Sequence, residues 1–165
     1  MEIQISLVDL TTQVHFAEIL EEARAWQRSN GSEGWNYPFD DEWLLPRIER
    51  GELFLGLIEH EPVAAFRILW EDRPYWGERE ARDSIYLHTF AVRRNKAGTG
   101  IGEAIIAKVA NMGLERGREK IRLDCSLSSA RLIAWYERNG FISVGTIFMN
   151  GKMMNLMERP VSQKS

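Results

Sequence analysis

The 165-residue chain, with 44% hydrophobic and 27% charged residues, has the size and composition of one folded domain and is unlike disordered or membrane-embedded proteins. Its formal charge of −3 gives no general attraction to nucleic-acid phosphates. The single cysteine, Cys125, cannot form an internal disulfide, and the three histidines lack the spacing of a zinc site. We therefore expect one cytoplasmic domain over residues 1–165, with no metal, no nucleic-acid partner and no membrane contact.

The first half of the chain changes from strand-like to helix-like periodicity and back. Alternation over residues 2–9 predicts a half-buried strand, and helical spacing from residue 14 predicts a helix that ends in the "RSNGSEG" turn. A second helix is expected from residue 40, where the "DDEW" carboxylates favour a helix start and Pro46 should kink or shorten it. Residues 52–70 read as two strands around an "EHEP" turn, and residues 84–92 as another strand.

The second half alternates helices with strands and closes with a hairpin. A helix is predicted from residue 101 to Gly117, then the strand "KIRLDCS", then a short helix within "SSARLIAWYERNGF". The last two strands are joined through Asn150 and Gly151, a favoured hairpin turn. This order of elements predicts a mixed α/β sheet with helices packed on it.

The stretch "VRRNKAGTGIGEAI" places Gly98, Gly100 and Gly102 where a strand passes into a helix. Free backbone N–H groups and the helix dipole can hold an anion at such a junction, with phosphate the expected guest. Two nucleotide-binding patterns are not met, because Glu103 stands where a P-loop needs lysine and the third glycine comes one residue too early for a dinucleotide fingerprint. A plain glycine-rich turn is the alternative.

Several motifs together resemble the GNAT superfamily of N-acetyltransferases, in particular its bacterial small-molecule branch. They are "LHTFAVRRNKAGTGIGEAIIAKV", "IRLDCS" and "ARLIAWYERNGF", and the resemblance covers roughly residues 50–145. It implies an α/β (α+β) fold with a mixed, mostly antiparallel sheet of about six or seven strands, splayed between the fourth and fifth and flanked by about four helices. It also implies acetyl-CoA as cosubstrate and no metal.

The resemblance assigns coenzyme A to two segments. The pantetheine arm would bind the main chain around Phe90, Ala91 and Val92, and a backbone N–H near Phe90 would stabilise the oxyanion of the thioester carbonyl. The phosphates would rest on the backbone amides of Ala97, Gly98, Thr99, Gly100, Ile101 and Gly102.

Two positions depart from the family pattern. Ala97 stands where the family has Gln or Arg, which removes a side-chain contact to the pyrophosphate but leaves the main-chain amides. Ser129 stands where the family often has an asparagine that contacts CoA, and capping of the following helix is the competing role for this shorter side chain. Arg93, Arg94 and Lys96 are either partners of CoA phosphates or solvated surface cations.

Acetyl transfer needs a neutral amine, because an alkylammonium resembles lysine in its high pKa. His88 is the candidate base: it titrates near neutral pH, it would share a strand face with residues 90 and 92, and arylalkylamine N-acetyltransferases carry a similar "LHxLAV" strand. A neutral, structural histidine is the alternative. By the family's tyrosine motif, Tyr136 would protonate the departing CoA thiolate, its alternative being a core residue. An acetyl-Cys125 intermediate is disfavoured, because a lone strand cysteine is usually a small buried hydrophobe.

The acceptor pocket is expected in the first half, where aromatics and carboxylates mix in "GSEGWNYPFDDEW" and "LWEDRPYWGERE". Such a mixture suits an ammonium group through charge and cation–π contact. The candidate acceptor contacts are Glu33, Trp35, Asp72 and Trp76, with ordinary core or loop packing as the alternative.

These assignments predict an enzyme that acetylates a primary amine of a small molecule by direct attack in a ternary complex. Two alternatives stay open: an acetyltransferase acting on protein N-termini or lysines, and a non-catalytic CoA-binding regulatory module. The sequence does not specify the oligomeric state, and the resemblance is compatible with a homodimer because dimers are frequent among relatives.

Overall fold

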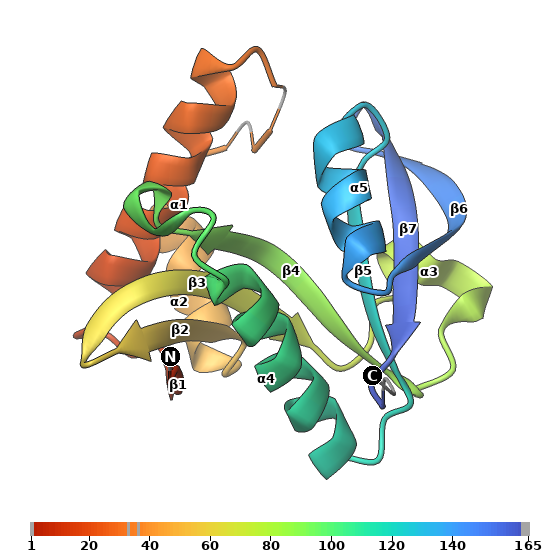
Figure 1. Ribbon diagram of the computed structural model, residues 1–165, viewed down its shortest axis with the longest axis horizontal. Helices are drawn as coiled ribbons and strands as arrows, with labels where there is room; N and C mark the ends of the chain where they lie inside the picture. Colours follow the sequence, from red (N-terminus) through yellow and green to blue (C-terminus); the bar gives the residue numbers. More distant parts are fainter. Residues whose placement is uncertain (1, 33, 36, 163–165) are drawn as a thin grey trace. The chain divides into compact units, whose positions relative to one another are not determined.

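The computed structural model describes residues 2–32, 34–35 and 37–162, and Figure 1 labels its elements. The strands are ordered β1-β2-β3-β4-β5-β7-β6 in one seven-stranded sheet. Their bounds are β1 (Gln4–Leu7), β2 (Leu53–Ile58), β3 (Glu61–Leu69), β4 (Ser84–Val92), β5 (Lys120–Ser126), β6 (Ile142–Met149) and β7 (Lys152–Pro160). The helices are α1 (Gln13–Ser29), α2 (Asp41–Glu49), α3 (Arg73–Trp76), α4 (Ile101–Glu115) and α5 (Ala130–Arg138).

The sheet is mixed, as predicted. β1 with β2, β2 with β3, β5 with β7 and β6 with β7 are antiparallel, whereas β4 and β5 are parallel. The parallel register pairs Ser84–Tyr86 with Lys120–Arg122. Within the described chain the paired positions end there although both strands continue, which confirms the predicted splay after the fourth strand.

One helix was not predicted. α3 has four residues, too few to give a periodic signal, and it carries proline in its first turn, where the missing N–H costs nothing. α2 begins as expected, because the Asp40 carboxylate accepts a hydrogen bond from the Trp43 N–H at 3.2 Å. Pro46 lies inside this helix, which still extends to Glu49.

The chain forms two compact units, and the first comprises Met1–Ile68 and Thr89–Ile106. In it, α1 and α2 pack on β2 and β3 around a core to which Ala91 of β4 also contributes. On β2, Gly56 lies against Ile105 of α4, since a Cβ there would be 2.8 Å from the Ile105 Cδ1. The buried members of the core are Val8, Phe16, Ile19, Leu20, Ala23, Phe39, Leu44, Leu53, Leu55, Ala65 and Ala91.

The second unit comprises Leu69–His88 and Ala107–Ser165. Trp76 of α3, Tyr86 of β4 and Leu156 of β7 form its aromatic core cluster. The β6–β7 hairpin turns through Asn150 and Gly151 at φ values of 53° and 79°, which confirms the predicted turn.

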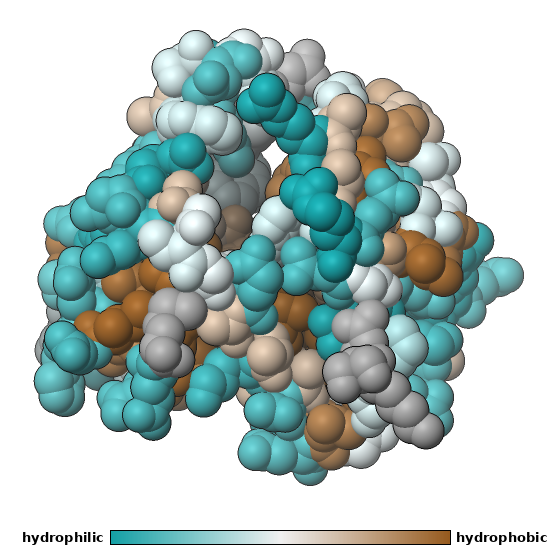
Figure 2. Space-filling view, viewed as in Figure 1, coloured by the Kyte–Doolittle hydropathy of each residue, from teal (hydrophilic) through white to brown (hydrophobic). Residues whose placement is uncertain are grey.

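Hydrophilic side chains cover most of the face seen in Figure 2, with apolar side chains scattered among them. Such scattered apolar exposure is ordinary for a folded domain. Among the described residues, no helix has both the length and the apolar character that crossing a membrane requires.

The contact of α4 with the sheet in the second unit yields a stability prediction. A Cβ at Gly113 would lie 2.9 Å from the Ile85 Cγ2 and 3.1 Å from the Val161 Cγ1. Gly113→Ala should therefore destabilise the protein by about 1–3 kcal/mol although alanine favours helices, because the packed β-branched neighbours must move. Urea unfolding measures this change. Asn111→Ala, at an exposed position of the same helix, is the control and should not destabilise; equal stabilisation by both variants would contradict the close packing.

Candidate active site

The glycine-rich loop of the first unit has the backbone form expected of an anion-binding turn. Gly98 and Gly100 have φ values of 75° and 87°, which favour glycine. On one side of the loop the backbone N–H groups of Lys96 and Ala97 bond to Arg93 and Arg94, and on the other the N–H of Ala104 bonds to Gly100. The intervening segment leads into the first turn of α4, where N–H groups have no acceptor within the helix.

The two arginines before this loop are bound to α1. The Arg93 guanidinium donates to the Pro62 carbonyl oxygen at 3.0 Å and lies 3.6 Å from Glu22, while the Arg94 guanidinium stacks 3.8 Å from the Trp26 ring centroid. The Arg94 N–H also donates to Glu22. These contacts hold both guanidinium groups against the protein, Arg93 half-buried and Arg94 still exposed to solvent.

β4 is strained where it passes from one unit to the other. Thr89 has a φ of 50°, a conformation costing of order 1–3 kcal/mol in a β-branched residue and concentrated at functional sites. Phe90 and Val92 are partly buried after it, and Ala91 is buried. Because the positive φ interrupts the alternation of side chains, the expectation that His88 shares a face with residues 90 and 92 no longer follows.

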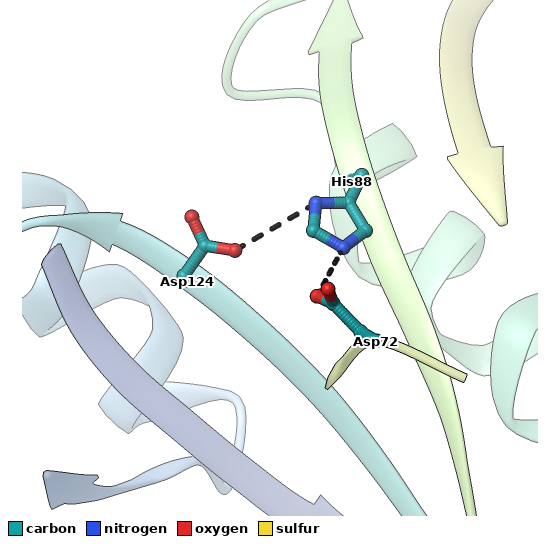
Figure 3. A group of neighbouring side chains, drawn as sticks. All are labelled: Asp72, His88 and Asp124. Carbon is teal, nitrogen blue, oxygen red and sulfur yellow. Dashed lines mark hydrogen bonds and ion pairs between the residues drawn. The ribbon is translucent and has the colours of Figure 1, made fainter. Parts of the chain in front are cut away.

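His88 lies between two carboxylates in the second unit, as Figure 3 shows. Its Nε2 is hydrogen-bonded to the Asp72 Oδ2 at 2.9 Å, and its Nδ1 is 3.6 Å from the Asp124 Oδ2. The three side chains are 13%, 3% and 8% exposed respectively. Two residues predicted separately, His88 as base and Asp72 as acceptor contact, are thus direct partners.

The parallel register of β4 and β5 explains why Asp124 faces His88. Tyr86 pairs with Arg122, so the residues two positions further along each strand come opposite one another on the same face. Asp72 reaches His88 from the segment before α3, where its backbone N–H is held by Glu80 at 2.9 Å. The Tyr75 ring of α3 lies 5.8 Å from the imidazole.

The buried guanidinium of Arg122, two residues before Asp124 on β5, is held by an ion pair and by hydrogen bonds. Arg122 donates to Glu158 at 2.9 Å, to the Tyr86 hydroxyl at 3.1 Å and to the Arg79 carbonyl oxygen at 2.9 Å. Its guanidinium also lies 4.4 Å from the Trp76 ring centroid. This network fixes the start of β4 against β5 and supports the site above it.

Unlike Arg122 and Glu158, which bond to each other, the buried Asp124 carboxylate lacks a hydrogen-bonded partner of opposite charge among the described residues. Burial raises its pKa to about 6, with the charge of Asp72 adding to the rise and His88 opposing it. The 3.6 Å gap to Nδ1 is too long for a hydrogen bond, and the Oδ2 is buried without a hydrogen-bond partner among the described residues. A buried carboxylate in this state is a feature of functional sites.

Tyr136 and Cys125 both stay protonated at neutral pH. Burial raises the pKa of the Tyr136 hydroxyl above its ordinary value, and the charges of Cys125 and Asp124 act in the same direction. Burial raises the pKa of the Cys125 thiol to about 12, with Asp124 contributing. Tyr136 therefore has a proton to give, whereas Cys125 lacks the thiolate needed for a nucleophile.

The remaining predicted site residues lie outside the group around His88: at a helix N-cap, in the two cores or beyond the described residues. Ser129 occupies the N-cap of α5 but makes no side-chain capping hydrogen bond, so the capping role is not observed. Trp76 is 3% exposed in the core, which corrects its assignment as an acceptor contact. Trp35 packs at the edge of the first unit's core, 5.5 Å from Phe39, as the packing alternative predicted. Glu33 lies outside the described residues.

Asp124 was missed from the sequence. Its position in "KIRLDCS" gave one signal, a carboxylate in the middle of a strand that is otherwise mostly buried. Pairing it with His88 requires the β4–β5 register, which the sequence does not contain. Asp72, His88 and Asp124 are also the described residues whose ligand atoms, all within 4.8 Å of one another, could hold a metal ion.

The comparisons with known proteins identify the family of this chain. The model of the Acetyltransferase (GNAT) family matches residues 17–141, a span that includes parts of both units. The chain is 32% identical over 136 residues to YesJ, an uncharacterized N-acetyltransferase of Bacillus subtilis (strain 168). The matched region covers 77% of this chain and 74% of YesJ.

Solved structures give the same result. A GNAT-family acetyltransferase from Listeria monocytogenes 4b F2365 superposes with a TM-score of 0.80 at 27% identity, covering 97% of this chain and 95% of that one. PaiA N-acetyltransferase from Thermoplasma acidophilum, solved in complex with coenzyme A, has a TM-score of 0.73 at 14% identity, covering 97% and 99%.

The fold and the family model define an acyl-CoA-dependent N-acyltransferase. This chain belongs to the Acetyltransferase (GNAT) family, whose cosubstrate is acetyl-CoA. The resemblance to the GNAT superfamily, the fold class, the enzyme class and the cosubstrate expected from the sequence are thereby confirmed.

The raised pKa of Asp124 predicts a pH-dependent cost in stability. Since its folded pKa of about 6 exceeds the ordinary 3.8, stability falls as pH rises between these values and the cost is complete above about pH 6. Asp124→Asn removes this cost, so its stability relative to wild type should grow by about 1–2 kcal/mol from pH 5 to pH 8. Urea unfolding at the two pH values tests this.

A matched control separates this effect from general pH effects. Glu119 is exposed in the same unit, so Glu119→Gln should keep the same stability difference from wild type at both pH values. A difference for Asp124→Asn that stays constant or shrinks toward pH 8 would contradict the burial of a charged carboxylate.

Proposed function

We propose that this enzyme transfers acetyl from acetyl-CoA to a primary amine of a small molecule by direct attack in a ternary complex. The observation that carries the proposal is the group of Asp72, His88 and Asp124, which brings two buried carboxylates within reach of one imidazole. Such a group suits an ammonium ion and can take up its proton, as acetylation of an amine requires.

The proposed CoA contacts are main-chain groups together with the Ser129 hydroxyl. The amides of residues 98–102 would hold the phosphates, whereas the Ala97 N–H, also expected there, already donates to Arg94. The positive φ values of Gly98 and Gly100 support this, because such residues in a short segment can direct successive N–H groups to one anion. The main chain of Phe90, Ala91 and Val92 would bind the pantetheine arm, and Ser129 remains a candidate contact, supported by a hydroxyl that does not cap its helix.

The proposed chemistry proceeds without an acetyl-enzyme. Cys125 is 5% exposed with a raised pKa, which opposes a covalent route through sulfur. His88, with the carboxylates beside it, would accept the amine's proton. Tyr136, held protonated by burial, would protonate the CoA thiolate as it leaves.

We place this reaction in the cytoplasm and expect a homodimer. A buried free thiol at Cys125 suits a reducing compartment. Light scattering of the purified protein measures the oligomeric state directly.

A screen of amines tests the proposal. Release of free CoA from acetyl-CoA would be measured with polyamines, arylalkylamines, aminoglycosides, amino acids and peptides. Turnover with a small amine supports the proposal, whereas turnover confined to peptides supports the protein-acetylating alternative. CoA binding without turnover on any acceptor supports the non-catalytic alternative.

Tyr136→Phe tests the general acid. We expect kcat to fall by about 100-fold with little change in the KM for either substrate, because the hydroxyl is needed when the thiolate departs. Steady-state kinetics at pH 7.5 measure this, and Tyr37→Phe, on the surface of the first unit, is the control. An unchanged kcat in Tyr136→Phe would remove the residue from the mechanism.

The phosphate-binding role of the loop can be separated from backbone strain. Gly98 and Gly31 have φ values of 75° and 73°, and a Cβ at either would meet no atom within 4 Å. Alanine at either position should lower stability by about 1 kcal/mol. Only Gly98→Ala should weaken CoA binding, by about 10-fold in calorimetry, because it distorts the amides proposed to hold the phosphates. Equal CoA affinity in both variants would argue against this role.

A further inference from the structure

We propose that Asp124 is the acceptor-binding group of this enzyme: it holds the ammonium of the primary amine and takes up its proton together with His88, while Asp72 is a positioning residue for His88. This inference rests on the proposed function and identifies the side chain that recognises its substrate class, a primary alkylammonium.

The first support is an unused acceptor atom. The Asp124 side chain is 8% exposed, and its Oδ2 has no hydrogen-bond partner in the part of the chain that the structure describes. This oxygen points toward the His88 Nδ1 at 3.6 Å (Figure 3). An ammonium nitrogen at a normal distance of about 2.8 Å from both atoms fits this spacing and would satisfy them together.

The second support is the local charge. Several other buried or half-buried carboxylates pair with arginine or lysine: Glu158 with Arg122 at 2.9 Å, Glu52 with Arg67 at 2.8 Å and Asp83 with Lys120 at 3.6 Å. The ion pairs of Asp72 and Asp124, over the described residues, both go to His88. Two carboxylates thus share one imidazole, and a bound cation would balance the negative charge that the imidazole alone does not.

The third support is the arrangement of donors and acceptors in the group. When the His88 Nε2 donates to the Asp72 carboxylate, the Nδ1 lone pair faces Asp124. Two acceptors then lie opposite one another with no donor between them. A bound ammonium supplies N–H donors to both.

Among the residues that the structure describes, the ion pairs of Asp72, His88 and Asp124 include no lysine or arginine. Tyr75 of α3 contributes a ring edge, and Asp72 contributes negative charge. Cys125 beside Asp124 and Tyr136 of α5 are held neutral by burial.

A divalent metal is the competing occupant, since all three side chains carry ligand atoms. The hydrogen bond to Asp72 occupies Nε2, so a metal that preserves it would take only Nδ1 and Asp124 as ligands. Catalytic zinc sites normally use three protein ligands. The geometry therefore favours the ammonium.

The protons and electrons of the step balance. The ammonium gives one proton to the Asp124–His88 pair, which passes it to solvent. The freed nitrogen lone pair forms the N–C bond to the thioester carbonyl, the C–S bond breaks, and its electron pair leaves on the CoA sulfur. A second ammonium proton makes up the one that the thiol gains, and the third stays on the amide.

Kinetics with an amine from the turnover screen test the role of Asp124. Asp124→Asn should raise the KM for the amine by about 10–100-fold while the KM for acetyl-CoA changes by less than about twofold. Asp83→Asn, a half-buried aspartate paired with Lys120, is the control and should change neither KM. A lowered kcat with both KM values unchanged would overturn the proposal.

A binding measurement makes the inference independent of turnover. With ¹⁵N-labelled imidazoles followed by NMR, propylammonium chloride should shift the His88 signals in wild type and Asp83→Asn but not in Asp124→Asn. Asp72→Asn should change the His88 tautomer, a readout that loss of stability alone would not produce. Zinc chloride binding more tightly than propylammonium, or no response to propylammonium, would overturn the proposal. Absence of turnover despite these shifts would instead contradict the proposed function.

Discussion

The hydrogen bond between the His88 Nε2 and the Asp72 Oδ2 is the interaction on which the candidate site depends. It joins the middle of β4 to the segment before α3, and it determines which imidazole nitrogen remains for chemistry. Without it, neither ring nitrogen would have a hydrogen-bond partner among the described residues, since Nδ1 lies 3.6 Å from Asp124. The 2.9 Å bond to an aspartate 3% exposed holds the ring in one orientation, with Nδ1 toward Asp124.

The second unit contains two kinds of buried charged residue: Arg122, whose charge is paired, and Asp124, whose carboxylate has an unpartnered oxygen among the described residues. The Arg122 guanidinium has Glu158 as its opposite charge and donates further hydrogen bonds to Tyr86 and Arg79. Its desolvated charge is therefore compensated. Two residues further along β5, Asp124 is buried with a raised pKa and an unused oxygen. A protein tolerates such a cost where it serves binding or proton transfer, and the paired network beneath supplies the rigidity that keeps the carboxylate in place.

Much of the fold was predictable because it depends on local patterns. The positive φ values of Gly98, Gly100 and the Asn150–Gly151 turn are predictable, because glycine and asparagine favour that conformation. The short α3 gave no periodic signal, and the positive φ of Thr89 has none, because threonine ordinarily disfavours that region. In the site, His88 was identified from its residue type, its strand position and the family resemblance, and Asp72 from a stretch that mixes aromatic and acidic residues. Their contact and the participation of Asp124 depend on tertiary register, and Trp76 was misassigned because composition does not separate a core aromatic from a surface one.

The burial of the chain's one cysteine has a practical consequence for enzymology. Thiol-reactive dyes that report CoA also label protein sulfhydryls, and this background limits their use with many enzymes. At 5% exposure and with so little thiolate at neutral pH, the sulfur of Cys125 should react slowly with them. The native polypeptide can therefore be assayed at high concentration by colorimetry, without removal of its cysteine.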